Sequence, residues 1–455
     1  MSTTGINLNI TPASLTSGAG IDVSSVVNQI LDSERGPEQI WQQQQSDLTL
    51  QTTDLTSINT NLSALQDKMN SLKDVLGALA SMIATSAQTG IVTATAQNTA
   101  AAGVHTVVVT NLAKTASYYS DPVATSSTSL GNGVITLQVG QTPQTITIDS
   151  TNNTLDGLAA YINKGSFGVT ASVINDDQGS RLALVSKTSG TAGDVSVTSN
   201  TSGLALHQSS AGLDASFSMD GVPLHSATNT VTTALPGVTL NLVSEAPSTP
   251  VQITVAPDTA QATQAVNDFV SAYNAVMGSI NSQFTVDATT NTEGPLAANS
   301  GLRSLQASLL SDVTYAIGGN DGFTSLSSLG INMADDGTLS VDSSTLSGVL
   351  SNNYSDFQNF FQSASGFGTN FGSDLTNLTD PTQGVLNLSL AENASVQKML
   401  TQQISDFEDR LSQQQQTLTT QYSQVNAALE EYPMLLAQVE SQLGTLPTSS
   451  SNSSK

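Results

Sequence analysis

Apolar residues recur at every seventh position in two long stretches, one near each end of the chain. The first stretch runs from Trp41 to Ile83 and the second from Ile404 to Leu446, with companion apolar residues three or four positions after many members. A seven-residue apolar repeat sustained in this way is typical of a coiled coil. The residues expected to pack in it are Leu48, Leu55, Ile58, Leu62, Leu65, Met69, Leu72, Leu76, Leu79, Ile404, Leu411, Leu418, Tyr422, Val425 and Leu429.

Neither helix can bury its apolar stripe alone, and no other stretch shows a helical stripe of comparable length. We therefore expect the two ends of the chain to pack together as a stalk, with the first long helix running from about residue 38 to 84. Its permanent core is predicted to join Leu55–Leu79 to Ile404–Leu418. Pro433 removes a helical hydrogen bond, which costs roughly 3 kcal/mol inside a helix, so we expect a kink or the end of the rigid section there.

A short helix is predicted before the first long one. Asp22 is a suitable N-cap, and the Gly36-Pro37 pair ends the helical pattern. Residues 1–40 are interpreted as a flexible N-terminal leg, and residues 432–455 as a C-terminal leg with a flexible tail. The apolar face of the leg helix consists of Val23, Val26, Val27, Ile30 and Leu31.

From about residue 90 the apolar period changes from seven to two, which predicts strands. Asp220-Gly221 is a favoured two-residue hairpin turn. The fold class is therefore α+β and multidomain, with β-rich domains nested between the terminal helices of a coiled-coil stalk. The predicted domains are a helical stalk domain of 41–85 and 259–431 with a β-hairpin near 331–341, a β-rich domain of 86–115 and 205–258, and an inserted α+β domain of 116–204.

Composition narrows the classes of partner. The chain has 11 Lys and Arg against 36 Asp and Glu, a net charge of −25, which argues against nucleic acid and anionic membranes. It has no cysteine, which excludes disulfides and thiol chemistry. The N-terminal residues lack the features of a cleaved secretion signal, and no apolar run is long enough for a membrane span. We expect a cytoplasmic protein, or one exported without a cleaved peptide.

Candidate chemistry is sparse. No nucleotide-binding loop, hydrolase elbow or zinc-protease motif occurs in the sequence. Asp335-Asp336 and Asp176-Asp177 could bind a cation, but a turn is the favoured interpretation of each. Residues 287–294 lack the alternating oxygen ligands and the final Glu of a calcium loop. We expect no enzyme, catalytic residue, metal or cofactor, and solvated or strand-borne positions for the histidines, His105, His207 and His225.

Several segments, in their order along the chain, resemble the bacterial flagellar hook-associated protein 2 family, the filament caps. The likeness runs from about residue 20 to 446, and departs from the family in the Gln-rich terminal helix and in Pro433. The segments that carry it are Gly20-Ile21-Asp22-Val23 with Glu34-Arg35 and Pro37, Val107 to Ala113, Thr154 to Gly190, Asp220-Gly221-Val222, Leu235 to Leu240, Leu302-Arg303-Ser304-Leu305, and Asp336-Gly337-Thr338-Leu339.

The resemblance implies a cap at the filament tip, built as a ring of several subunits, about five. It implies legs that order on the filament and a plate beneath which flagellin is guided into place. It also implies flagellin, a hook–filament junction protein and a cytoplasmic export chaperone as partners. Export would pass through the flagellar type III system without a cleaved signal, to an extracellular position.

Two alternatives remain open. One is another axial flagellar protein, either a hook–filament junction protein or a flagellin-like subunit, because such proteins also have helical termini. The other is a cap that doubles as an adhesin, with loops of the 116–204 module binding host-surface glycans or proteins.

Overall fold

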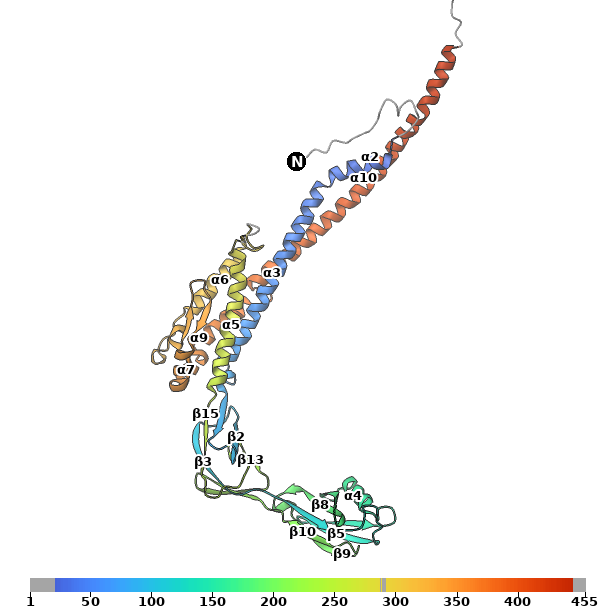
Figure 1. Ribbon diagram of the computed structural model, residues 1–455. Coiled ribbons are helices and arrows are strands. Elements are labelled where there is room, and N and C mark those ends of the chain that lie inside the picture. The colour runs from blue at the N-terminus through green and yellow to red at the C-terminus, as the bar shows by residue number, and fades with distance from the viewer. Residues whose placement is uncertain (1–20, 287, 289–291, 445–455) are drawn as a thin grey trace, which may run out of the picture.

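The computed structural model describes residues 21–286, 288 and 292–444. Long helices form one part of an elongated molecule, and two β-rich modules follow at its other end, the outer one set at an angle (Figure 1). The chain leaves the helical part once, passes through both modules and returns, so its first helices lie beside its last one. The predicted α+β multidomain architecture, with nested β-rich units, is confirmed.

The terminal helices lie antiparallel along one another, as the two heptad stretches predicted. Asn59 Nδ2 donates to Asn387 Oδ1 at 3.2 Å, and Gln45 Nε2 donates to Thr401 Oγ1 at 2.9 Å. Along these contacts, the residue numbers in α10 rise as those in α3 fall, so the two helices run antiparallel. These helices are α2 (Val23–Glu34), α3 (Gly36–Lys73) and α10 (Val385–Gly444).

The predicted pairing of Leu55–Leu79 with Ile404–Leu418 is wrong. The seam of α3 from Leu55 to Leu72 packs mainly on α5 (Thr259–Phe284), and α10 contributes only its first turns, including the fully buried Leu386. The antiparallel register instead brings the middle of α10 beside α2 and the start of α3. Sequence reasoning missed this arrangement because it treated the helical face of α5 as too short to compete.

The first long helix ends earlier than predicted. α3 stops at Lys73, and Ile83 lies in strand β1 (Met82–Ser86). The chain turns after Asp74, and in this turn Gly77 lies so close to the carbonyl oxygen of Ser71 that a side chain there would collide with it. Leu76 follows the heptad but falls in this turn, where it is 73% exposed, so its assignment to the packed seam is wrong. Leu79 is buried just beyond the turn.

The last helix is longer and less interrupted than predicted. α10 runs for 60 residues and contains Pro433 in its interior, so the rigid section does not end at this proline. The predicted tail after residue 444 lies outside the described residues.

Aromatic rings fill the helical core beside α5. Phe269 meets Phe371 edge to face at 6.0 Å between ring centroids, and Phe360 stacks on Phe367 at 5.3 Å. The other elements of this part are η1 (Ala78–Ala80), α6 (Ser300–Val313), η3 (Asn320–Gly322), η4 (Leu326–Leu329), β16 (Ile331–Met333), β17 (Leu339–Val341), α7 (Ser343–Asn352), α8 (Tyr354–Gln362) and α9 (Phe367–Leu378).

The first β module is assembled from two separate parts of the sequence. Its sheets have the strand orders β1-β15-β3-β11-β12 and β13-β14-β2, and they share one hydrophobic cluster. Asp220 and Gly221, at φ 50° and 82°, form the predicted tight turn between β11 and β12. Its strands beyond β1 are β2 (Val92–Ala96), β3 (Gly103–Asn111), β11 (Ala215–Met219), β12 (Val222–Ser226), β13 (Thr230–Leu235), β14 (Val238–Leu242) and β15 (Val251–Pro257).

The outer module is inserted into the first one. Helix α4 (Leu155–Lys164), capped by the side chain of Thr154, shares a hydrophobic cluster with two sheets of strand order β10-β4-β8-β7 and β6-β5-β9. The remaining elements are β4 (Thr115–Ser120), β5 (Gly133–Val139), β6 (Thr142–Ile148), β7 (Val169–Asp176), β8 (Gly179–Ser189), η2 (Thr191–Gly193), β9 (Val195–Asn200) and β10 (Leu206–Ser210). Within the described part of the chain, no helix combines the length and apolarity needed to cross a membrane.

Truncating Leu62 to Ala should destabilise the helical part by about 2–5 kcal/mol, because this fully buried side chain of α3 would leave a cavity. Leu50→Ala is the matched control on the same helix, since Leu50 is 54% exposed and its loss should cost less than about 0.5 kcal/mol. Denaturant unfolding followed by helix circular dichroism measures both. Equal losses would contradict the packing of α3 on α5.

Candidate functional site

The outer half of the stalk is a pair of helices, α2 and α10, joined by a small apolar cluster. Val27 and Leu31 of α2 are buried against Phe407 and Leu411 of α10, each at most 7% exposed. We call these four residues the leg cluster. Val23, Trp41, Leu418 and Tyr422 pack around it. The predicted apolar face of the leg helix is therefore buried or half-buried in its entirety.

This packing corrects the interpretation of residues 1–40 as a flexible leg. Residues 23–34 form a capped helix: the Asp22 carboxylate accepts a hydrogen bond from Ser25 N at 3.1 Å, as the sequence predicted. The helix docks on α10 within the same chain, so its order needs no second molecule. Residues 1–20 lie outside the described residues.

A charged cluster fastens the junction between α2 and α3 to α10. The Arg35 guanidinium donates to Glu38 Oε2 at 2.6 Å and to Glu408 Oε1 at 2.7 Å. Glu38 is only 6% exposed, and Gln42 donates to its other oxygen at 2.8 Å. The hydrogen bond from Arg35 lowers the pKa of Glu408, and the two carboxylates raise the pKa of Arg35. Glu38 is buried and doubly partnered, so it depends on this arginine.

Two rings lie next to the charged cluster. Trp41 meets Phe407 edge to face at 5.5 Å between centroids, and the guanidinium of Arg410 lies over the Phe407 ring at 4.7 Å. Sequence reasoning included Trp41 in the heptads but missed Arg35, Glu38, Phe407 and Glu408. The available signal was local: Arg35 stands three residues before Glu38 at the start of the helix, a spacing that favours an ion pair.

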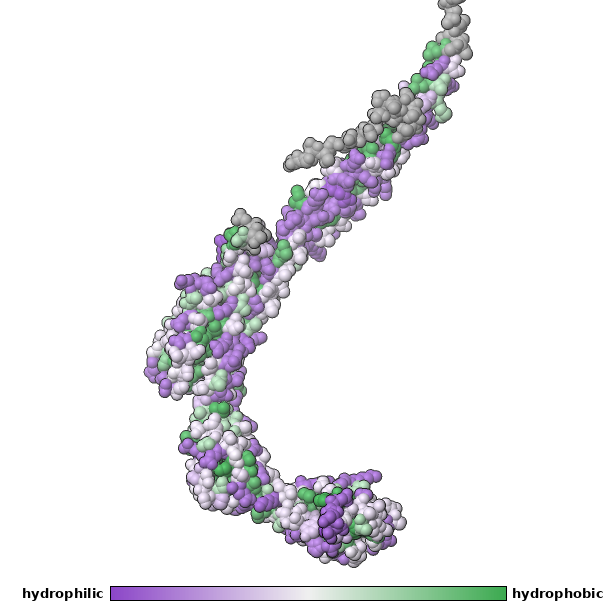
Figure 2. All heavy atoms as spheres, in the orientation of Figure 1, coloured by the Kyte–Doolittle hydropathy of each residue, from purple (hydrophilic) through white to green (hydrophobic). Residues whose placement is uncertain are grey.

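Burial along the predicted α10 seam decreases toward the C-terminus. Leu411 is buried, but Val425 is 50% exposed, so its assignment to the packed seam is wrong for the single chain. α2 begins at Val23 and leaves the outer part of α10 uncovered by any described residue. Figure 2 shows green, hydrophobic atoms on this outer part, beyond a mostly purple stalk. Among the residues predicted to pack in the coiled coil, those that are half-buried in the structure are Leu48 of α3 and Ile404, Leu418, Tyr422 and Leu429 of α10.

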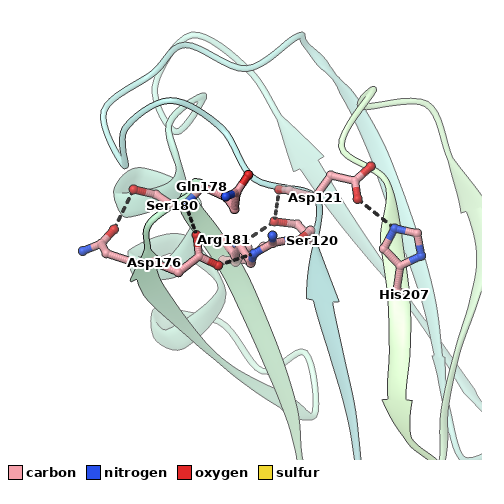
Figure 3. Close-up of polar contacts among 9 residues, drawn as sticks. Ser120, Asp121, Asp176, Gln178, Ser180, Arg181 and His207 are labelled. Atoms are coloured by element: carbon pink, nitrogen blue, oxygen red, sulfur yellow. Dashed lines mark hydrogen bonds and ion pairs between the residues drawn. The ribbon is translucent and has the colours of Figure 1, made fainter.

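A second polar cluster lies at one end of the four-stranded sheet in the outer module (Figure 3). Arg181 on β8 donates to Asp176 Oδ2 at 2.8 Å and to Ser120 O at 3.2 Å. His207 Nε2 lies 2.9 Å from Asp121 Oδ1. The hydrogen bond from Arg181 lowers the pKa of Asp176. These groups form hydrogen bonds with one another, so the cluster joins the ends of strands β4, β7, β8 and β10.

The other candidate sites are structural as well. Asp336 Oδ1 accepts from Thr338 N and Oγ1 at 3.0 and 2.6 Å, which is a side-chain-stabilised turn. His105, His207 and His225 lie on strands β3, β10 and β12. Across the described ranges, no three His, Asp or Glu residues gather as a metal site would require.

One carboxyl group in the helical part carries an unusual pKa. Asp312 on α6 stands beside Asp374 on α9 at a cavity of about 220 Å³. Among the described residues, neither its buried Oδ2 atom nor the nearby buried hydroxyl of Tyr273 has a hydrogen-bond partner. Burial, aided by the charge of Asp374, raises the pKa of Asp312 to about 6.

The comparisons with known proteins match both ends of this chain to one family. The model of the flagellar hook-associated protein 2 N-terminus matches residues 19–116, and that of the C-terminus matches 212–433. Together they cover more than half of the chain. The chain belongs to the flagellar hook-associated protein 2 family. Residues 134–188, in the outer module, also match the flagellin hook IN motif.

Individual members of the family align over most of their length. The B-type flagellar hook-associated protein 2 of Pseudomonas aeruginosa is 28% identical, covering 80% of this chain and 83% of that protein. The flagellar hook-associated protein 2 of Escherichia coli K12 is 27% identical, covering 92% and 95%. The crystal structure of three domains of the flagellar cap protein FliD from Escherichia coli superposes with a TM-score of 0.56 at 25% identity, covering 75% of this chain and 99% of that one.

Arg35→Ala should loosen the leg, because it leaves the carboxylate of Glu38 buried without its cationic partner. We expect the amide hydrogens of α2 to exchange about tenfold faster or more. Lys398→Ala, an exposed cation elsewhere on α10, is the control and should change nothing. Hydrogen exchange measured by mass spectrometry tests this prediction. Unaltered exchange in α2 would show that the charged cluster of Arg35, Glu38 and Glu408 does not stabilise the docking of α2 on α10.

Asp312→Asn should stabilise the protein at neutral pH. The raised pKa means that the folded state holds this proton more tightly than the unfolded chain, so stability falls as pH rises from about 4 to about 6. The variant should melt about 2 °C higher above pH 6 and match the parent near pH 4. Asp177→Asn, in an exposed turn, is the control. A pH-independent difference would contradict the assignment.

Proposed function

We infer that this chain is a subunit of the flagellar filament cap. The carrying observation is that the family match covers both chain ends, which the fold brings together as one helical stalk. A solved relative with the same multidomain fold is described as a flagellar cap protein. The role is structural: the protein stands at the filament tip and guides flagellin subunits into the growing filament.

The geometry supports an oligomeric scaffold. An elongated subunit with a helical stalk at one end and β-rich modules at the other can place its modules in a plate while its stalk reaches the filament (Figure 1). We propose a ring of several copies, about five, joined by heterologous contacts. The nested β-rich units supply the plate, and the α2–α10 pair supplies the leg.

The export route and further partners are part of the same proposal. A chain without cysteine passes through a narrow channel unfolded without any disulfide to block it. We propose export through the flagellar type III system, with a cytoplasmic chaperone before export and flagellin and the hook–filament junction protein outside. Host-surface glycans or proteins remain candidate ligands of the outer module.

The alternative of another axial flagellar protein is disfavoured. The models that match the two ends are those of hook-associated protein 2, and the match extends over nearly the whole length of the Escherichia coli relative.

Deletion of the gene should leave cells that release flagellin monomers into the medium and bear no long filaments. The full-length chain should restore filaments, whereas a chain lacking residues 1–40 should be exported with folded β modules and restore none. Electron microscopy of filaments and immunoblots of the medium give the result. Normal filaments in the deletion strain would overturn the cap function, and normal filaments with the shortened chain would overturn the role of the leg.

A further inference from the structure

The outer part of α10 carries an apolar stripe with no partner among the described residues. Its members follow a strict alternation of four- and three-residue steps, and most are half exposed or more, Val439 at 50% and Leu443 at 61%. This is the spacing of a coiled-coil seam. The stripe consists of Val425, Leu429, Tyr432, Leu436, Val439 and Leu443.

The stripe continues an interface that the structure already contains. Lower on α10, Leu411, Leu418 and Tyr422 occupy the same seam and are covered by α2. Where α2 begins, the chain is still attached to α10: Ile21 N donates to Asn426 Oδ1 at 2.7 Å. Since α2 runs antiparallel to α10, the chain before Ile21 starts at the base of the uncovered stripe.

We propose that the N-terminal segment of the same chain covers this stripe, with Ile6, Leu8 and Ile10 as its contact residues. Their alternation with Asn7 and Asn9 gives an extended segment one apolar and one polar face.

The dimensions of the tether fit this occupant. Leu436 lies about 15 Å along α10 from Asn426, at 1.5 Å per residue. A coil of about ten mostly small residues, the composition of 11–20, has a root-mean-square span of about 17 Å. The five residues 6–10 span about 13 Å when extended, which matches the centre of the stripe from Tyr432 to Val439. A tether of matching length gives the highest effective concentration of the segment at the stripe.

Charge separates this occupant from a second copy of the chain. Glu430, Glu431 and Glu440 flank the stripe, and no Lys or Arg lies between residues 425 and 444. Two copies paired through this face would bring like charges together, on molecules that each carry −25. Residues 1–20 contain no charged side chain.

Because the chain has no cysteine, a pair of introduced cysteines tests the contact in the full-length protein. Leu8→Cys with Leu436→Cys should form an intramolecular disulfide about tenfold faster than Leu8→Cys with Gln438→Cys, at a rate independent of protein concentration. Gln438 is exposed at about the same distance along α10 but on the opposite face of the helix. Mass spectrometry of the linked peptides identifies the product.

Equal rates for the two pairs would overturn the proposal, because a tether without a docking site samples both faces alike. Concentration-dependent covalent dimers of the single variant Leu436→Cys would also overturn it and assign the stripe to a second copy. As an independent readout, Ile6→Ser with Leu8→Ser and Ile10→Ser should raise the fluorescence of a hydrophobic dye about twofold, and Asn7→Ser with Asn9→Ser should not. No rise with the first variant would contradict the contact.

Discussion

The antiparallel contact between α3 and the two helices that return to it is the interaction on which the structure depends. The side chains from Leu55 to Leu72 have no apolar partner within their own helix, and they become buried when α5, α9 and the first turns of α10 pack on them. These partners lie some 200 to 330 residues further along the chain. Both β modules are therefore carried on a helical part that forms only when segments far apart in the sequence meet.

Different interactions stabilise the two sections of the helical part. Near the β modules, a thick apolar core with interlocking rings buries its side chains almost completely. Toward the tip the core thins to the leg cluster, and one arginine–carboxylate cluster and two rings replace bulk burial. Beyond Asn426, α10 packs on no other helix among the described residues. Stability therefore declines along the stalk from the modules outward, which is the gradient that a docking leg requires.

Sequence reasoning succeeded where a local pattern decides the structure. The seam of α3 from Leu55 to Leu72, the N-cap at Asp22 and the Asp220-Gly221 turn each depend on a few neighbouring residues, and the structure has all of them. It failed where distant segments compete for one surface. The heptad pattern predicts that Leu62 packs against another helix, but it does not predict whether that helix is α5 or α10. No residue near Arg35 in the sequence predicts its ion pair with Glu408. The exposure of Leu76 came from a turn that overrode the seven-residue period.

The nesting of the chain also orders its folding in time. Hairpins such as β7–β8 close over short loops, whereas α3 must wait for segments hundreds of residues away, and the entropy of closing so long a loop is lost before any contact repays it. If the chain emerges from a channel with its N-terminal part first, the β modules can fold before the last helix has emerged. The stalk can form only when α10 is also free. The β modules would therefore be folded before the helical stalk that carries them.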